Sequence, residues 1–139
     1  MTARRRRRAP VRRELEARTL VFVYGTLLVG ERNHRHLTGA RLVGEARTKP
    51  AFWLHDLGPF PALVAGGEHA VLGEVYAVDE AVLAALDRLE DHPRLYRRTS
   101  IVLANRSSVE TYLLTPKQVA GHPIIDSGSW RARRKGRTS

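Results

Sequence analysis

The sequence predicts an α+β domain built on a mixed or barrel-like sheet. Short apolar segments separated by glycine, proline and polar turn residues recur along the chain, as is typical of strands. One segment, residues 79–91, has the apolar spacing of an amphipathic helix. A chain of 139 residues with no internal repeat and no linker is expected to form one domain that buries its own core.

The first strand is expected at residues 20–24, where all five residues are apolar or aromatic. A strand that is apolar on both faces is normally buried on both sides, so this strand is predicted to be central in the sheet. Gly25 ends it, because glycine accepts backbone angles that other residues resist and lets a ligand approach the main chain. Two interpretations stay open: an ordinary turn after a core strand, or the start of a ligand-binding loop.

A short helical segment and four further strands are expected next. Asn33 is suited to cap a helical segment that runs to Leu37. The strands are expected at residues 40–48, 52–54, 62–65 and 69–78. Leu42 and Val43 form the apolar centre of the first, and glycine and proline between the second and third indicate a loop. Gly73, in the last strand, indicates a β-bulge or a close approach of another group to the backbone.

The predicted helix begins after Asp79, a favourable N-cap residue, and ends before Pro93, which disfavours helical geometry at the preceding residue. Residues 96–104 and 109–114 flank a polar turn. This pattern predicts a β-hairpin.

A carboxylate falls on the apolar face of the predicted helix. Leu83, Leu86 and Glu90 are spaced i, i+3 and i+7 and therefore share a face, whereas Asp87 and Asp91 are expected to point toward solvent. Burial disfavours the charged form of a carboxyl, and the negative end of the helix disfavours it further, so we expect a raised pKa for Glu90. A carboxyl that titrates near neutrality is suited to accept and return a proton.

Two other interpretations of Glu90 stay open. The last helical turn can fray, which would turn the side chain to solvent. Alternatively, the carboxylate can form a buried salt bridge, with Arg94, Arg97 or Arg98 as its partner.

The net charge of +10 is concentrated at the two ends of the chain. Residues 1–18 carry eight Arg and two Glu, a net charge of +6, and residues 131–139 carry four Arg and one Lys, a net charge of +5. Residues 19–130 are close to neutral, at −1. Blocks of like charge are usually disordered and solvated, so we expect a basic arm, a domain and a basic tail with these boundaries. A start site further downstream is an alternative explanation of the arm.

Composition and motifs argue against several classes of function. Without cysteine the chain forms no disulfide, thiolate nucleophile or cysteine metal site. The six histidines lack zinc-binding spacing, and the phosphate-binding, dinucleotide-binding and hydrolase motifs are missing. No apolar run approaches the roughly 18 residues of a membrane span, and no hydrophobic region follows the basic N-terminus as in a secretory signal. We therefore expect a cytoplasmic protein that spans no membrane.

Five motifs, in order and at similar spacing, resemble those of the gamma-glutamylcyclotransferase-like superfamily over about residues 20–131. They are VFVYGTL at 21–27 followed by Asn33-His34, FPALV at 60–64, GEVY at 73–76, LDRLE at 86–90 and LYRR at 95–98. The most similar branch is gamma-glutamylamine cyclotransferase, which also has the VFVYGTL opening and a GEVYAVDE run, here at 73–80.

The resemblance implies a small mixed β-barrel with helices packed outside and a cavity between the loop after the first strand and the helix. It places Glu90 as the catalytic acid/base and Tyr96 in the cavity wall. It places four residues in the substrate loop, namely Tyr24, Gly25, Thr26 and Leu27. No metal and no organic cofactor are implied.

Two positions depart from the family pattern. Leu89 stands where phenylalanine is commoner, which changes the shape of the cavity slightly. Asp91 stands where glycine or serine is common. If Asp91 points inward, repulsion between like charges raises the pKa of Glu90 further.

The activity implied by the resemblance is intramolecular. The α-amine of a small γ-glutamyl substrate attacks its own γ-carbonyl, which closes a ring to 5-oxoproline and releases an amine. We expect Glu90 to take a proton from the attacking amine and to pass one to the leaving nitrogen. Backbone N–H groups of residues 25–27 are expected to bind the α-carboxylate.

Other functions stay open at this point. One is a non-catalytic protein that binds a small ligand and whose Arg-rich ends associate with nucleic acid or another polyanion without sequence specificity. Another is cyclotransfer on a specialised metabolite that carries a γ-glutamyl group.

Overall fold

The computed structural model describes residues 18–133, so the expected basic arm, apart from Arg18, and residues 134–139 of the expected tail lie outside the described residues. The elements are β1 (Thr19–Val23), η1 (His34–Leu37), β2 (Arg41–Arg47), β3 (Phe52–Asp56), β4 (Pro61–Ala65), β5 (Leu72–Val78), α2 (Glu80–Leu89), β6 (Arg97–Val102) and β7 (Ser108–Leu113). Within this part of the chain, no helix has both the length and the apolar character that a membrane crossing needs.

The seven strands form one mixed sheet, as predicted. Its order is β2-β5-β1-β7-β4-β3, and β6 pairs with β7 off this path. The pairs β1–β7 and β4–β7 are parallel and the others are antiparallel. Strands β2 and β3 stand at the two ends of this path and do not pair with each other, so the sheet of the described residues does not close into the expected barrel. The α+β class is confirmed.

One edge of strand β7 is shared by two strands, β1 and β4, and the stretch of β7 between their two pairing points is called the fork. Strand β6 pairs with β7 along its whole length, which occupies one edge. On the other edge β1 pairs only where Val21 faces Glu110, and β4 pairs only where Leu63 faces Leu113. The backbone between these two points is therefore left for other partners. Tyr24, the residue directly after β1, places its side chain there.

Strand β1 is central, as its apolar run predicted. Val21, Phe22 and Val23 are buried between β5 and β7. On β5, a Cβ atom at Gly73 would lie 2.2 Å from the carbonyl oxygen of Val23, so this position accepts only glycine. Of the two expectations for Gly73, close backbone approach is therefore correct.

Strand β2 departs from expectation. Leu42 and Val43 do not face the core, because they are 51% and 59% exposed. The strand lies at the edge of the sheet and pairs only with β5, and its register shifts between Leu42 and Gly44. Gly44 and Ala46 are the half-buried positions instead, so the most apolar pair of residues is turned outward.

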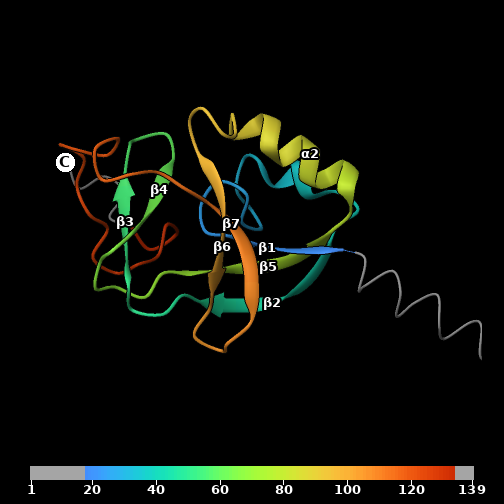
Figure 1. Ribbon diagram of the computed structural model, residues 1–139, viewed down its shortest axis with the longest axis horizontal. Coiled ribbons are helices and arrows are strands. Elements are labelled where there is room, and N and C mark those ends of the chain that lie inside the picture. The colour runs from blue at the N-terminus through green and yellow to red at the C-terminus, as the bar shows by residue number, and fades with distance from the viewer. Residues whose placement is uncertain (1–17, 134–139) are drawn as a thin grey trace, which may run out of the picture.

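Helix α2 and the 3-10 helix η1 lie together on one side of the sheet (Figure 1). Asp79 caps α2 as predicted, since its carboxylate accepts a 2.8 Å hydrogen bond from the N–H of Val82. The helix ends at Leu89, two residues before the predicted end, and Glu90 is its C-cap. Asn33 flanks η1 at its start but makes no side-chain cap bond.

Candidate functional site

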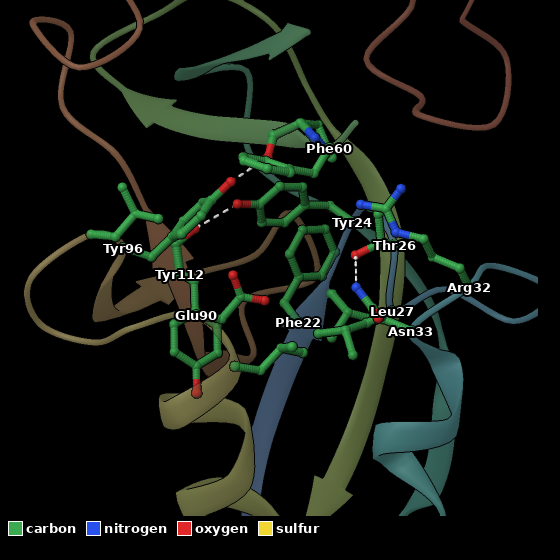
Figure 2. Close-up of a pocket in the computed structure, with 15 residues that line it drawn as sticks. Phe22, Tyr24, Thr26, Leu27, Arg32, Asn33, Phe60, Glu90, Tyr96 and Tyr112 are labelled. Carbon is green, nitrogen blue, oxygen red and sulfur yellow. Dashed lines mark hydrogen bonds between the residues drawn. The ribbon is translucent and has the colours of Figure 1, made fainter. Parts of the chain in front are cut away.

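A pocket lies where the loop after β1 faces the C-terminal end of α2 (Figure 2). Its volume is about 130 Å³. The residues expected in the site, Tyr24, Gly25, Thr26, Leu27, Glu90 and Tyr96, all line it. The structure thus brings together residues from positions 24 to 96 in one cavity, and Arg32, Asn33, Phe60 and Tyr112 join them.

The loop after β1 is closed by hydrogen bonds between its two ends. The backbone N–H of Asn33 donates to the carbonyl of Thr26 at 2.9 Å, and the side-chain amide of Asn33 donates to the Thr26 hydroxyl at 3.0 Å. The ring Nδ1 of His34 lies 2.9 Å from the carbonyl of Leu27, which can only accept, so Nδ1 donates. These bonds explain why an Asn-His pair follows the opening strand at this distance.

Gly25 is required by close packing against β4. A Cβ atom on Gly25 would lie 2.5 Å from Cγ of Pro61. Within residues 18–133, the N–H groups of Gly25, Thr26 and Leu27 donate to no protein acceptor. All three residues line the pocket, so their backbone N–H groups are candidate donors for an anionic group.

Two tyrosines of the pocket are fixed by backbone hydrogen bonds. The phenol of Tyr24 enters the fork of β7, where it donates to the carbonyl of Tyr112 at 2.6 Å and accepts from the N–H of Leu63 at 3.2 Å. The phenol of Tyr96 donates to the carbonyl of Pro61 at 2.7 Å. Burial raises the pKa of Tyr24 and the pKa of Tyr96. Both phenols therefore stay protonated and serve as walls of the pocket rather than as bases.

Glu90 is held in place through its backbone. Its N–H donates to the carbonyl of Leu86 at 2.9 Å, and its own carbonyl accepts from the N–H of Tyr96 at 3.2 Å. The side chain points into the pocket, toward Tyr24 and Phe22 (Figure 2). Burial raises the pKa of the Glu90 carboxyl from its ordinary 4.5 to about 7. At neutral pH the carboxyl is therefore present in both protonation states.

The two other interpretations of Glu90 do not hold. The side chain lies in the pocket rather than in open solvent, and no ion pair among the described residues includes it. Of its expected partners, Arg94 pairs with Asp91 at 3.2 Å, and Arg98 pairs with Asp87 at 2.9 Å and with Glu110 at 3.1 Å.

The two aspartates beside Glu90 behave differently from each other. Asp91 is exposed, with a backbone φ of 54° that turns the chain away from the helix, so it adds no charge to the pocket. Asp87 was expected to face solvent, but this prediction is wrong. Its carboxylate accepts a 2.6 Å hydrogen bond from the phenol of Tyr112 in addition to the bonds from Arg98, because α2 packs against the β6–β7 hairpin.

Sequence reasoning missed two residues of the pocket that carry polar chemistry. Arg32 is the cationic side chain among the described lining residues, and it lies beside Thr26, across the pocket from Glu90 (Figure 2). Loop residues follow no hydrophobic periodicity, so no sequence pattern singles out Arg32. Tyr112 belongs to β7, where alternation predicts burial and no more. Its position next to Glu90 follows from the fork in the sheet. No cluster of three potential metal ligands occurs among residues 18–133.

Comparison with known proteins places this geometry in a family. Residues 21–132 match the model of the family described as gamma-glutamyl cyclotransferase, AIG2-like. A Vibrio cholerae relative, named provisionally as a gamma-glutamylcyclotransferase, is 48% identical over 115 residues, which are 82% of this chain and 96% of its own.

Two further comparisons concern mammalian proteins. A bovine gamma-glutamylaminecyclotransferase is 40% identical over 127 residues, with 76% of this chain and 73% of the relative covered. The crystal structure of an AIG2-like protein from mouse superposes with a TM-score of 0.68 at 30% identity and covers 78% of this chain and 86% of its own.

Proposed function

The chain belongs to the gamma-glutamyl cyclotransferase, AIG2-like family of enzymes, and on this premise we propose that it converts a γ-glutamyl-amine, or a related γ-glutamyl amide, to 5-oxoproline and a free amine. The observation that carries the proposal is the Glu90 carboxyl. Its pKa of about 7 and its position in a pocket walled by protonated phenols suit a group that accepts and then returns one proton.

The proposed reaction forms one bond and breaks another within the substrate. The α-nitrogen attacks the γ-carbonyl carbon and forms the C–N bond of a five-membered ring. The bond from this carbon to the amide nitrogen then breaks, and the amine leaves. Because nucleophile and electrophile belong to one molecule, the protein mainly has to fold the substrate and move a proton.

Glu90 is proposed to move that proton. As a carboxylate it takes a proton from the attacking nitrogen, and as a carboxylic acid it gives a proton to the leaving nitrogen. A pKa near neutrality suits both steps, because neither protonation state is strongly disfavoured. The phenols of Tyr24 and Tyr96 direct their protons to backbone carbonyls, so they leave the transfer to Glu90.

The opposite side of the pocket is proposed to bind the α-carboxylate of the substrate. The N–H groups of Gly25, Thr26 and Leu27, all of which line the pocket, and the guanidinium of Arg32 are the candidate donors. This separation places the anionic end of the substrate away from Glu90. A second negative charge close to Glu90 would raise the pKa of its carboxyl further and oppose its ionisation.

The size of the pocket bears on the leaving group. A cavity of about 150 Å³ is known to hold one benzene molecule, so the volume of about 130 Å³ suits a five-membered ring and little more. The leaving amine is therefore proposed to extend out of the pocket mouth. The name of the bovine relative favours amines as leaving groups.

The proposal is tested by measuring 5-oxoproline release from a panel of γ-glutamyl-amines, ε-(γ-glutamyl)lysine and γ-glutamyl amino acids. We expect turnover by the wild type and a loss of about 10²- to 10⁴-fold in kcat for Glu90→Gln, the usual contribution of a general acid/base. Asp91→Asn is the matched control, because it removes the adjacent exposed carboxylate. Ligand binding without turnover by the wild type would support a binding protein instead.

A further inference from the structure

The Gly-Glu-Val-Tyr strand contains a buried carboxylate that the proposed chemistry does not use. Glu74, on β5, is 5% exposed and lies outside the pocket of Glu90. A buried carboxylate is costly unless its oxygens are hydrogen-bonded or paired. Three donors satisfy Glu74: the N–H of Val29 at 3.1 Å, the phenol of Tyr76 at 3.0 Å and the guanidinium of Arg131 at 3.1 Å.

Arg131 contacts the same loop residue as Glu74. Its guanidinium also donates to the carbonyl of Val29. Both backbone polar groups of Val29 are therefore held, the N–H by Glu74 and the carbonyl by Arg131. The side chain of Val29 is 48% exposed, so these contacts fix the backbone of the loop rather than a packed side chain.

The residue before Arg131 holds a second point of the loop. Trp130 is buried, and its indole N–H donates to the carboxylate of Glu31 at 3.1 Å. The guanidinium of Arg133 lies over the Trp130 ring, 3.4 Å from its centre, in a cation–π arrangement.

The residues held by these contacts belong to the same loop as residues that line the pocket. Glu31 precedes Arg32, and the N–H of Glu31 donates to the carbonyl of Leu28, whose own N–H donates to the carbonyl of Gly25. A chain of backbone hydrogen bonds thus runs from the held residues to Gly25, the first of the candidate donors.

We propose that Glu74, Trp130 and Arg131 form a clasp that holds the loop of residues 25–33 in the conformation that binds the substrate carboxylate. This inference rests on the proposed function for the identity of the ligand. Glu74 and Arg131 are positioning residues, because they act through the loop and do not line the pocket of Glu90. The clasp also gives the Gly-Glu-Val-Tyr motif a function that its position in a buried strand does not explain.

The experiment compares wild type with Glu74→Gln, Arg131→Met and the double variant. Arg131→Met keeps the apolar stem and removes every donor. We expect KM for a γ-glutamyl substrate to rise about tenfold, as for the loss of one charge-assisted anchor, with kcat and the pH profile of kcat/KM unchanged. The two changes should not be additive, because they remove the same contact. Arg41→Met, at an exposed position of edge strand β2, is the matched control.

Hydrogen–deuterium exchange supplies a readout that does not depend on activity. We expect faster exchange in peptides that cover residues 24–33 of Arg131→Met, and unchanged exchange in α2. Unchanged KM together with unchanged loop exchange would overturn the clasp. A joint shift of kcat and the pH profile would do the same, because it would mean that the variants disturb Glu90. If the wild type shows no turnover, the proposed function fails, and loop exchange still decides whether the clasp exists.

Discussion

The phenol of Tyr24 donates a 2.6 Å hydrogen bond to the backbone carbonyl of Tyr112, and the phenol of Tyr112 in turn donates to Asp87 on α2. Tyr112 therefore connects the loop that is proposed to bind the substrate with the helix that carries Glu90. The two halves of the pocket come from segments about 65 residues apart, and this pair of bonds sets their separation.

Removing the Tyr24 phenol should destabilise the fold. In Tyr24→Phe the carbonyl of Tyr112 and the N–H of Leu63 both lose their hydrogen bond with the phenol inside the fork. Leaving a buried polar group unpaired costs about 1–3 kcal/mol, which gives about 2–6 kcal/mol for two groups. The remaining pairing of β4 with β7 at Leu63 offsets part of this cost, so we expect the free energy of unfolding to fall by about 2–4 kcal/mol in urea titration. Tyr96→Phe is the control, because it removes a bond to one carbonyl only and should cost less. Equal losses in the two variants would contradict the importance of the fork.

The activity should depend on pH through one ionisation. Glu90 must be a carboxylate to accept the proton, and burial raises its pKa to about 7. We therefore expect kcat/KM to rise with pH and to level off above about 8, with a single apparent pKa close to 7. Rates in a series of overlapping buffers at constant ionic strength measure this profile. An acid limb near the ordinary value of 4.5 would show that the base is not the buried carboxyl.

Stability should depend on pH in the opposite direction. The pKa of Glu90 is higher in the folded state, about 7, than its ordinary 4.5, so the folded state holds the proton more tightly. The contribution of Glu90 to stability is therefore fully present below pH 4.5 and is lost as pH rises through about 7. The full shift corresponds to about 3 kcal/mol, which the partial exposure of the carboxyl to solvent reduces to about 2.

The variant Glu90→Gln isolates this contribution. We expect it to become more stable than the wild type by about 2 kcal/mol between pH 5 and pH 8, in urea titrations of both proteins at each pH. A constant difference across this range would show that Glu90 does not titrate there. Loss of activity combined with a gain of stability is typical of a group that is buried for chemistry.

The parts of the site that sequence reasoning found are those with a local signature. The strand before Gly25 is buried on both faces, and Glu90 occupies an apolar register of a helix, so both are visible in short windows of sequence. The predicted helix ends two residues later than α2 does. Asp91 adopts a left-handed backbone conformation, which helix propensity does not predict.

The remaining features depend on contacts between distant segments. The fork of β7 arises because two strands share one edge, and it determines where Tyr112 lies. The outward turn of Leu42 follows from its position on an edge strand, which periodicity does not report. The contact between Arg131 and Glu74 joins residues 57 positions apart, and a run of basic residues near a chain end predicts solvation instead.

Arg32 should determine affinity for every γ-glutamyl substrate to the same extent. It is the cation among the described lining residues and lies on the side of the pocket away from Glu90, where the α-carboxylate is proposed to bind. For Arg32→Met we expect KM to rise about tenfold for all substrates, whatever the leaving amine, with kcat changed less than about twofold. Arg88→Met, an exposed arginine of α2 outside the pocket, is the control. A rise in KM confined to substrates whose leaving amine carries a carboxylate would contradict this assignment. It would mean that Arg32 binds the carboxylate of the leaving amine rather than the α-carboxylate that all the substrates share.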